Sequence, residues 1–165
     1  AEFKKEADTD VPAMREKFGG DGAPEYTMEM SASEIKSENT HSVVISEYLY
    51  TGGANGNGLY KVITASEENG EVLSLSQVVK KDKQAAFTAF IKKELLAWRP
   101  DGGNTSPLFT EEVANLTFSS FKNWSVDDKN LTVYFDKYEI GPGVLGPVAF
   151  PVSLSKIKDF LNFSF

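Results

Sequence analysis

Two strand-like arms surround a glycine-rich loop in residues 42–66, which read SVVISEYLYTGGANGNGLYKVITAS. The first arm is rich in β-branched and aromatic residues, which favour the pleated surface of a strand. Its side chains alternate, with Val43 and Ile45 on one face and Tyr48 and Tyr50 on the other. The loop contains two Asn-Gly pairs, and both residue types tolerate the positive φ that tight hairpin turns need. The segment therefore predicts an antiparallel hairpin.

Helical and strand-like patterns flank this hairpin on both sides. Apolar residues from Phe3 to Phe18 recur at helical spacing, and residues 26–32 alternate as in a strand. Phe87, Ile91, Leu95 and Trp98 share one face of a helix expected over residues 83–98. Residues 121–126 and 131–135 then resemble two further strands around a turn, and a short final helix follows. The length of 165 residues predicts one compact domain, with an N-terminal helix and strand segment (1–45) and a glycine-hairpin core (46–165).

Composition excludes several classes of function. The chain has no cysteine and one histidine, which rules out disulfides and makes a zinc site with nitrogen and sulfur ligands implausible. A net charge of −7 argues against nucleic acid and favours cationic partners, although an acidic balance can serve solubility alone. We expect no cofactor and no metal.

Few residues suit catalysis. Asp136 and Glu139 are close in sequence and could act as paired carboxylates on a glycan, but their separation in space decides that chemistry. A strip of tyrosines across the hairpin could instead stack on a sugar or bind a protein partner; it consists of Tyr48, Tyr50 and Tyr60. The alternative for the strip is a packed cluster on the sheet.

Two motifs resemble a bacterial extracytoplasmic domain family of unknown general function. The first is YLYTGGANG in residues 48–56, followed by GEVLSL in residues 70–75. The second is LTVYFDKYEIGP in residues 131–142, followed by Gly146 and a short strand that contains Pro151. Members of this family include the RsiV-like ectodomain of a lysozyme-sensing anti-sigma factor and a domain that precedes the catalytic module of a peptidoglycan deacetylase. The family usually has a histidine where this chain has Asn55, so any chemistry of that histidine is missing here.

The resemblance implies an α+β fold, with helices packed on an antiparallel or mixed sheet. It also implies export to the periplasm or cell surface, with anchoring as a lipoprotein or by an N-terminal segment, and no membrane contact by the domain itself. We expect a non-catalytic binding or sensing domain for a cell-envelope component such as peptidoglycan, or for a cationic protein such as lysozyme. The alternatives are a glycan-processing enzyme that uses Asp136 and Glu139, and a purely structural accessory domain. The candidate binding residues lie in the two motifs: Tyr50, Thr51, Gly52, Gly53, Asn55, Tyr134, Asp136, Tyr138 and Glu139.

Overall fold

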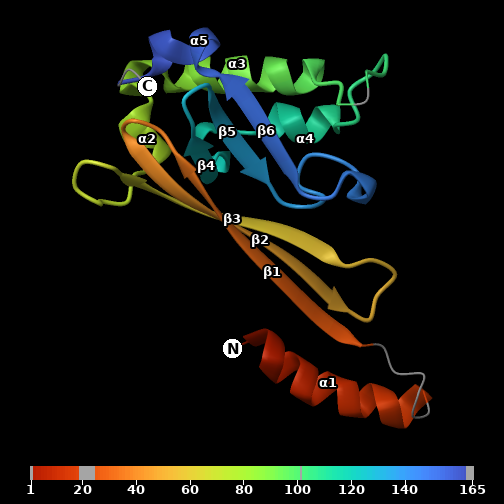
Figure 1. Ribbon diagram of the computed structural model, residues 1–165. Coiled ribbons are helices and arrows are strands. Elements are labelled where there is room, and N and C mark those ends of the chain that lie inside the picture. Colours follow the sequence, from red (N-terminus) through yellow and green to blue (C-terminus); the bar gives the residue numbers. More distant parts are fainter. Residues whose placement is uncertain (1, 19–24, 101, 163–165) are drawn as a thin grey trace.

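The computed structural model describes residues 2–18, 25–100 and 102–162, and it shows the α+β architecture that the sequence predicts (Figure 1). The strands divide into two three-stranded antiparallel sheets, ordered β1-β2-β3 and β4-β5-β6. The N-terminal elements are α1 (Glu2–Phe18), β1 (Tyr26–Lys36), β2 (Thr40–Thr51) and β3 (Asn57–Ser66). The C-terminal elements are α2 (Leu75–Val78), η2 (Lys81–Lys83), α3 (Gln84–Ala97), α4 (Thr110–Asn115), η3 (Phe118–Ser120), β4 (Asn123–Val126), β5 (Asn130–Phe135), η4 (Gly143–Leu145), β6 (Val148–Ser153), α5 (Leu154–Ile157) and η5 (Lys158–Phe160).

The predicted hairpin is confirmed as β2 and β3. Their pairing runs from Thr40 opposite Ser66 to Leu49 opposite Asn57, which leaves residues 52–56 as the loop. The face turned toward the second sheet carries mainly hydroxyl-bearing side chains, with Val44 as a buried apolar residue among them. Ser42 and Thr64 are buried there and hydrogen-bond at 2.9 Å, whereas Val43 on the opposite face is 37% exposed. The alternation of side chains predicted from the sequence is therefore present. The more apolar face of the hairpin, however, points away from the second sheet.

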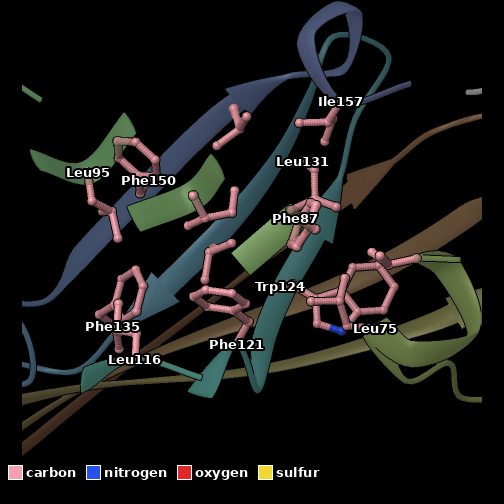
Figure 2. Close-up of a cluster of buried hydrophobic side chains, with 14 of the residues drawn as sticks. Leu75, Phe87, Leu95, Leu116, Phe121, Trp124, Leu131, Phe135, Phe150 and Ile157 are labelled. Carbon is pink, nitrogen blue, oxygen red and sulfur yellow. The ribbon is translucent and has the colours of Figure 1, made fainter. Parts of the chain in front are cut away.

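The hydrophobic core lies on the second sheet and not on the hairpin (Figure 2). Helix α3 buries Phe87, Ile91 and Leu95 completely, as its spacing predicts, while Trp98 follows the helix and is partly buried. The Phe87 ring sits edge-on to three other phenylalanine rings, those of Phe118, Phe121 and Phe160, at centroid separations of 5.9–6.2 Å. Such edge-to-face contacts stabilise aromatic clusters beyond the burial of their area. In Figure 1 the hairpin sheet extends away from this core, and α1 lies beyond its far end.

Side chains of the second sheet and its loops close the outer edge of β3. The Asp136 Oδ1 atom accepts the Tyr60 N–H at 2.7 Å, and the Asn123 side chain accepts the Val62 N–H at 3.1 Å while donating to the Tyr60 carbonyl at 2.9 Å. The Thr64 hydroxyl also donates to the Trp124 carbonyl at 2.7 Å. Buried backbone groups need such partners. We call this set of bonds between β3 and the second sheet the seam, and it fixes the two sheets relative to each other.

Candidate functional site

The two sequence motifs meet in space through Lys137. Its backbone N–H donates to the Gly58 carbonyl at 2.8 Å, and its ammonium group donates to the Gly56 carbonyl at 2.6 Å. A Cβ atom added to Gly58 would lie 2.8 Å from Cδ of Pro147, so the absence of a side chain permits this close approach. The hairpin loop and the segment after β5 therefore form one continuous surface.

Each motif presents a tyrosine ring backed by a glycine on this surface. A Cβ atom at Gly56 would overlap the Tyr48 ring, and one at Gly143 would overlap the Tyr138 ring. Both tyrosines remain exposed, Tyr48 by 42% and Tyr138 by 53%. The Lys137 ammonium lies 5.0 Å from the centroid of the Tyr138 ring, within cation–π range. We call these three exposed or half-buried residues, Tyr48, Lys137 and Tyr138, the tyrosine surface.

The backbone at Tyr138 is unusual. Its φ is 71°, in the left-handed region that a residue with a Cβ seldom adopts. Such conformations persist only where surrounding contacts impose them, and they concentrate at functional sites. Here the contact with Gly143 and the bonds from Lys137 to the hairpin loop hold Tyr138 in place.

A polar hollow of about 400 Å³ opens beside the tyrosine surface and shares Lys137 with it. The lining residues that carry charge or amide groups are Asn57, Lys122, Asn123, Asp136, Lys137 and Glu139. Together they offer charged and uncharged hydrogen-bonding groups, both donors and acceptors, beside the exposed tyrosine rings. This combination of apolar ring faces and convergent polar groups is typical of a small binding site.

The two carboxylates in the hollow both hold the backbone. Asp136 Oδ1 accepts the Tyr60 N–H across the seam, and Glu139 Oε2 accepts the Asp136 N–H at 2.8 Å. Partial removal from water raises the pKa of Glu139, and the negative charge of Asp136 adds to this shift. The Asp136 N–H bond and the Lys122 charge act in the opposite direction. The structure thus gives Asp136 a role in joining the sheets, and it leaves Glu139 at the rim of the hollow.

The remaining candidate residues from the sequence occupy different environments. Tyr134 is largely buried, with its hydroxyl 2.9 Å from that of Ser125 and its ring 5.0 Å from that of Tyr60, and it packs between the two sheets in the wall of the polar hollow. Thr51 ends β2 opposite Tyr26, and Tyr50 is half-buried beside it. The loop residues Gly53 and Asn55 are exposed. Gly52 has a positive φ of 84°, whereas Gly53 does not and would accept a Cβ without a clash.

Sequence reasoning missed Lys137, Asn123 and the two supporting glycines. Lys137 lies between Asp136 and Tyr138 in the second motif, where its position between two candidates was the available signal. Asn123 gave no local signal, because its amide bonds to residues more than 60 positions earlier.

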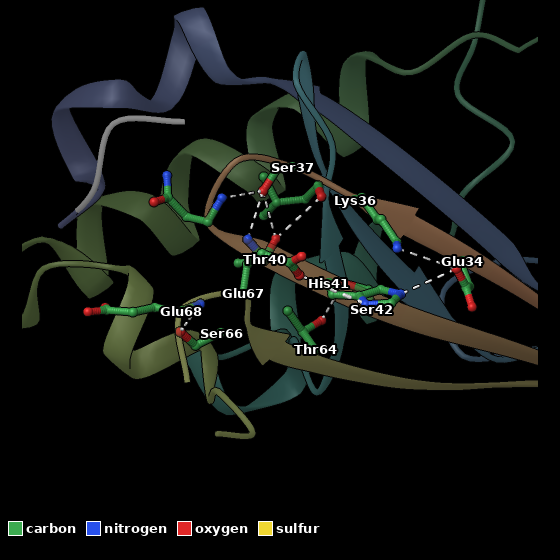
Figure 3. A network of polar contacts seen from close by, with 12 residues as sticks. Glu34, Lys36, Ser37, Thr40, His41, Ser42, Thr64, Ser66, Glu67 and Glu68 are labelled. Carbon is green, nitrogen blue, oxygen red and sulfur yellow. Dashed lines mark hydrogen bonds and ion pairs between the residues drawn. The ribbon is translucent and has the colours of Figure 1, made fainter. Parts of the chain in front are cut away.

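A second hollow, of about 430 Å³, lies at the other end of the hairpin and is acidic, with Glu38, Glu67, Glu68 and Glu71 in its wall. Figure 3 shows that the polar groups around it mainly hold turns together: the Ser37 hydroxyl accepts the Thr40 N–H at 3.1 Å, and the Ser66 hydroxyl accepts the Glu68 N–H at 3.2 Å. His41 lies beside Glu34, with 3.4 Å between Nε2 and the carboxylate. We therefore regard this end as a structural turn.

Neither metal-binding clusters nor membrane spans occur in the described part of the chain. Residues 2–18, 25–100 and 102–162 contain no group of three or more acidic, histidine or cysteine side chains able to hold a metal ion. Across these same ranges, no helix combines the length and the apolar character that crossing a bilayer requires.

Comparison with known families finds a match in the C-terminal half. Residues 76–155 match the family described as a protein of unknown function, DUF3298, and they include α3, the second sheet and Lys137 with Tyr138. The chain is also 25% identical over 126 residues to a Bacillus subtilis (strain 168) protein named peptidoglycan-N-acetylmuramic acid deacetylase PdaC. This match covers 76% of the chain but 27% of PdaC. The chain therefore resembles one region of that protein, while the RsiV-like part of the resemblance stays a prediction.

Two solved structures share the fold. A DUF3298 family member from Bacteroides fragilis NCTC 9343 superposes with a TM-score of 0.69 at 21% identity, covering 98% of this chain and 64% of that one. A DUF3298 family protein from Pseudomonas aeruginosa PAO1 gives a TM-score of 0.60 at 17% identity, covering 92% and 69%. At these identities the likeness concerns the fold alone.

Proposed function

We propose that the chain, whose residues 76–155 match the DUF3298 family, is a non-catalytic recognition domain of the bacterial cell envelope, outside the cytoplasm, whose ligand is the glycan of peptidoglycan. The observation that carries this proposal is the tyrosine surface, in which two exposed rings are fixed on glycines beside a polar hollow. The similarity to a region of a protein named as a peptidoglycan deacetylase supports the choice of ligand.

The chemistry of the surface suits a saccharide. The apolar face of a sugar ring packs on an aromatic ring, and its hydroxyl and acetamido groups require hydrogen-bonding partners nearby. The hollow provides amide groups from Asn57 and Asn123, ammonium groups from Lys122 and Lys137, and the Glu139 carboxylate. Since Tyr48 and Tyr138 are already held by their glycines, binding would cost little side-chain ordering.

The placement of the carboxylates favours recognition over turnover. A glycosidase needs one carboxyl group as a proton donor and a second as a nucleophile or base, both facing the substrate. Asp136 instead accepts a backbone N–H of β3, and Glu139 accepts the N–H of Asp136 itself. Each carboxylate thus already has one oxygen bonded to the backbone, and Asp136 in particular serves to join the two sheets.

Binding to purified, insoluble peptidoglycan tests the proposal. The protein should co-sediment with the polymer, and soluble muropeptides should compete for it. Tyr138→Ala should weaken binding about 5- to 150-fold, the range of one stacked aromatic contact at about 1–3 kcal/mol. Tyr138→Phe, which keeps the ring, and Val72→Ala, which removes an exposed apolar side chain elsewhere, should bind like the unmodified chain. Equal binding by all four proteins would contradict the proposal.

The net charge of −7 favours a second candidate, a cationic protein such as lysozyme. Opposite charges accelerate association most at low ionic strength, where the Debye length reaches about 30 Å at 0.01 M salt. Calorimetric titration with lysozyme at 0.01 M and 0.15 M salt should then show tighter binding at the lower concentration. The absence of heat at both concentrations would remove this candidate and leave the glycan.

A further inference from the structure

The first sheet has two edge strands, β1 and β3, and only the outer edge of β3 is covered by other parts of the described chain. The outer edge of β3 is closed by Asp136, Asn123 and Lys137, and further along by Leu73 and Glu71 through backbone bonds to Thr64 and Ser66. Strand β1 pairs with β2 over eleven residues and has no strand on its other side within the described residues. A bare edge of this length is a template for pairing with another chain.

The free hydrogen-bonding groups of β1 belong to its even-numbered residues. Tyr60 and Val62 of β3 direct their N–H groups away from β2, so the alternation of antiparallel bonding makes Ser46 and Val44 of β2 face β1. Their partners Ser31 and Ser33 are therefore bonded to β2. The residues between them, such as Ala32, direct their N–H and carbonyl groups to the open side.

Strand β1 has few of the devices that usually protect an edge, and its charged residues other than Lys36 are Glu29 and Glu34. Its sequence, YTMEMSASEIK, contains no proline and no glycine, and its one lysine stands at the last position. Residues 28–34 are exposed on both faces, and Met28 and Met30 are 42% and 57% exposed. Two exposed methionines on one face of an open edge indicate a surface that becomes covered.

We propose that β1 pairs antiparallel with β1 of a second copy of this chain, around a two-fold axis at Ser31, to give a continuous six-stranded sheet. This register uses all eleven residues: Met30 faces Ala32 of the second copy, Met28 faces Glu34, Glu29 faces Ser33 and Tyr26 faces Lys36. No two like charges face each other. The two Met30 side chains lie diagonally across the axis, on the outward face of the sheet, and each Met28 lies further out beside Glu34 of the other copy.

Charge complementarity at the two ends favours this partner. Lys36 of one copy comes opposite Tyr26 of the other, and the Tyr26 hydroxyl lies 3.3 Å from the Asp10 carboxylate of α1. In the single chain Lys36 has only a loose contact with Glu34, at 3.8 Å. Each end of the joined strands therefore places a cationic side chain within reach of the Asp10 carboxylate. This inference does not depend on the identity of the ligand at the tyrosine surface.

Cysteine cross-linking tests the register directly, because the chain contains no cysteine of its own. At the axis the two Ser31 residues form a non-hydrogen-bonded pair with Cα atoms about 4.5 Å apart, within the range of a disulfide. Ser33 lies on the same face and is also exposed, but its two copies would be offset by four residues, about 14 Å along the strands. Under mild oxidation Ser31→Cys should form a covalent dimer nearly completely, and Ser33→Cys should not. Equal cross-linking of both variants, or of neither, would overturn the proposal.

The mass in solution provides an independent test. The unmodified chain should show a concentration-dependent dimer by sedimentation equilibrium. Ala32→Pro removes an outward N–H and should give a monomer, whereas Ala32→Val keeps that N–H and should still dimerise. Lys36→Glu should weaken the dimer about tenfold, since each dimer contains two such contacts, and Asp10→Lys in the same chain should restore it. A monomer at millimolar concentration, or an Ala32→Pro protein that is folded and still dimeric, would overturn the proposal.

Discussion

Replacing Asp136 by alanine removes the carboxylate that accepts the Tyr60 N–H at 2.7 Å across the seam between the sheets. A hydrogen bond to a charged group contributes about 1.5–3 kcal/mol to stability, and the half-buried position of Asp136 favours the lower end. A loss of about 1.5 kcal/mol raises the ratio of unfolded to folded protein about tenfold. With a urea m-value of about 2 kcal/mol per molar, the midpoint should fall by about 0.7 M.

Asp136→Asn is the matched control for this experiment. Its amide oxygen can still accept the Tyr60 N–H, so it should lose less than half of what Asp136→Ala loses. Urea unfolding followed by tryptophan fluorescence measures both variants, and unchanged m-values would show that the unfolding transition is comparable. An alanine variant within about 0.3 kcal/mol of the unmodified chain, or an asparagine variant as unstable as alanine, would refute a structural role for Asp136.

Three further outcomes follow from the same structure. Gly52→Ala should cost about 1–2 kcal/mol in unfolding free energy because its φ is 84°, whereas Gly53→Ala, with room for a Cβ, should change it by less than about 0.5. Leu95→Ala empties a fully buried position under α3 and should cost about 2–5 kcal/mol in the same urea assay. Burial raises the pKa of Glu139, so the ionised side chain is disfavoured in the folded state and Glu139→Gln should raise the melting temperature at pH 7. That gain should disappear below about pH 4, where the unmodified side chain is protonated in both states.

Local patterns in the sequence were sufficient for the hairpin and for α3. The Asn-Gly pairs and the period-two alternation of residues 42–66 belong to neighbouring residues, and so does the helical spacing of Phe87, Ile91 and Leu95. Each of these signals acts within one element, and tertiary contacts did not override it.

The arrangement of the two sheets depends on contacts between distant residues. Thr64 bonds to Trp124 and Tyr60 bonds to Asp136, across 60 and 76 positions, and hydroxyl or carboxylate groups at these positions look like ordinary polar surface in the sequence. These bonds explain why the more apolar face of the hairpin points outward. They also give Asp136, which the sequence offers as one of two paired carboxylates, a backbone partner.

The tyrosine surface was predictable only in part. The second motif predicts Tyr138 as a binding residue, but its positive φ and its support by Gly143 arise from the loop conformation. Tyr134, from the same motif, is buried by contacts with Tyr60 and Ser125 that no spacing rule reveals.

The most direct test of recognition without turnover is a titration of isotope-labelled protein with soluble peptidoglycan fragments, followed by NMR. We expect the largest amide shift changes at Gly56, Lys137, Tyr138 and Gly143, with fragments that keep their mass and their acetyl groups throughout. Shift changes confined to the acidic hollow around Glu38 and Glu68, or the release of acetate or new reducing ends during the titration, would contradict this account.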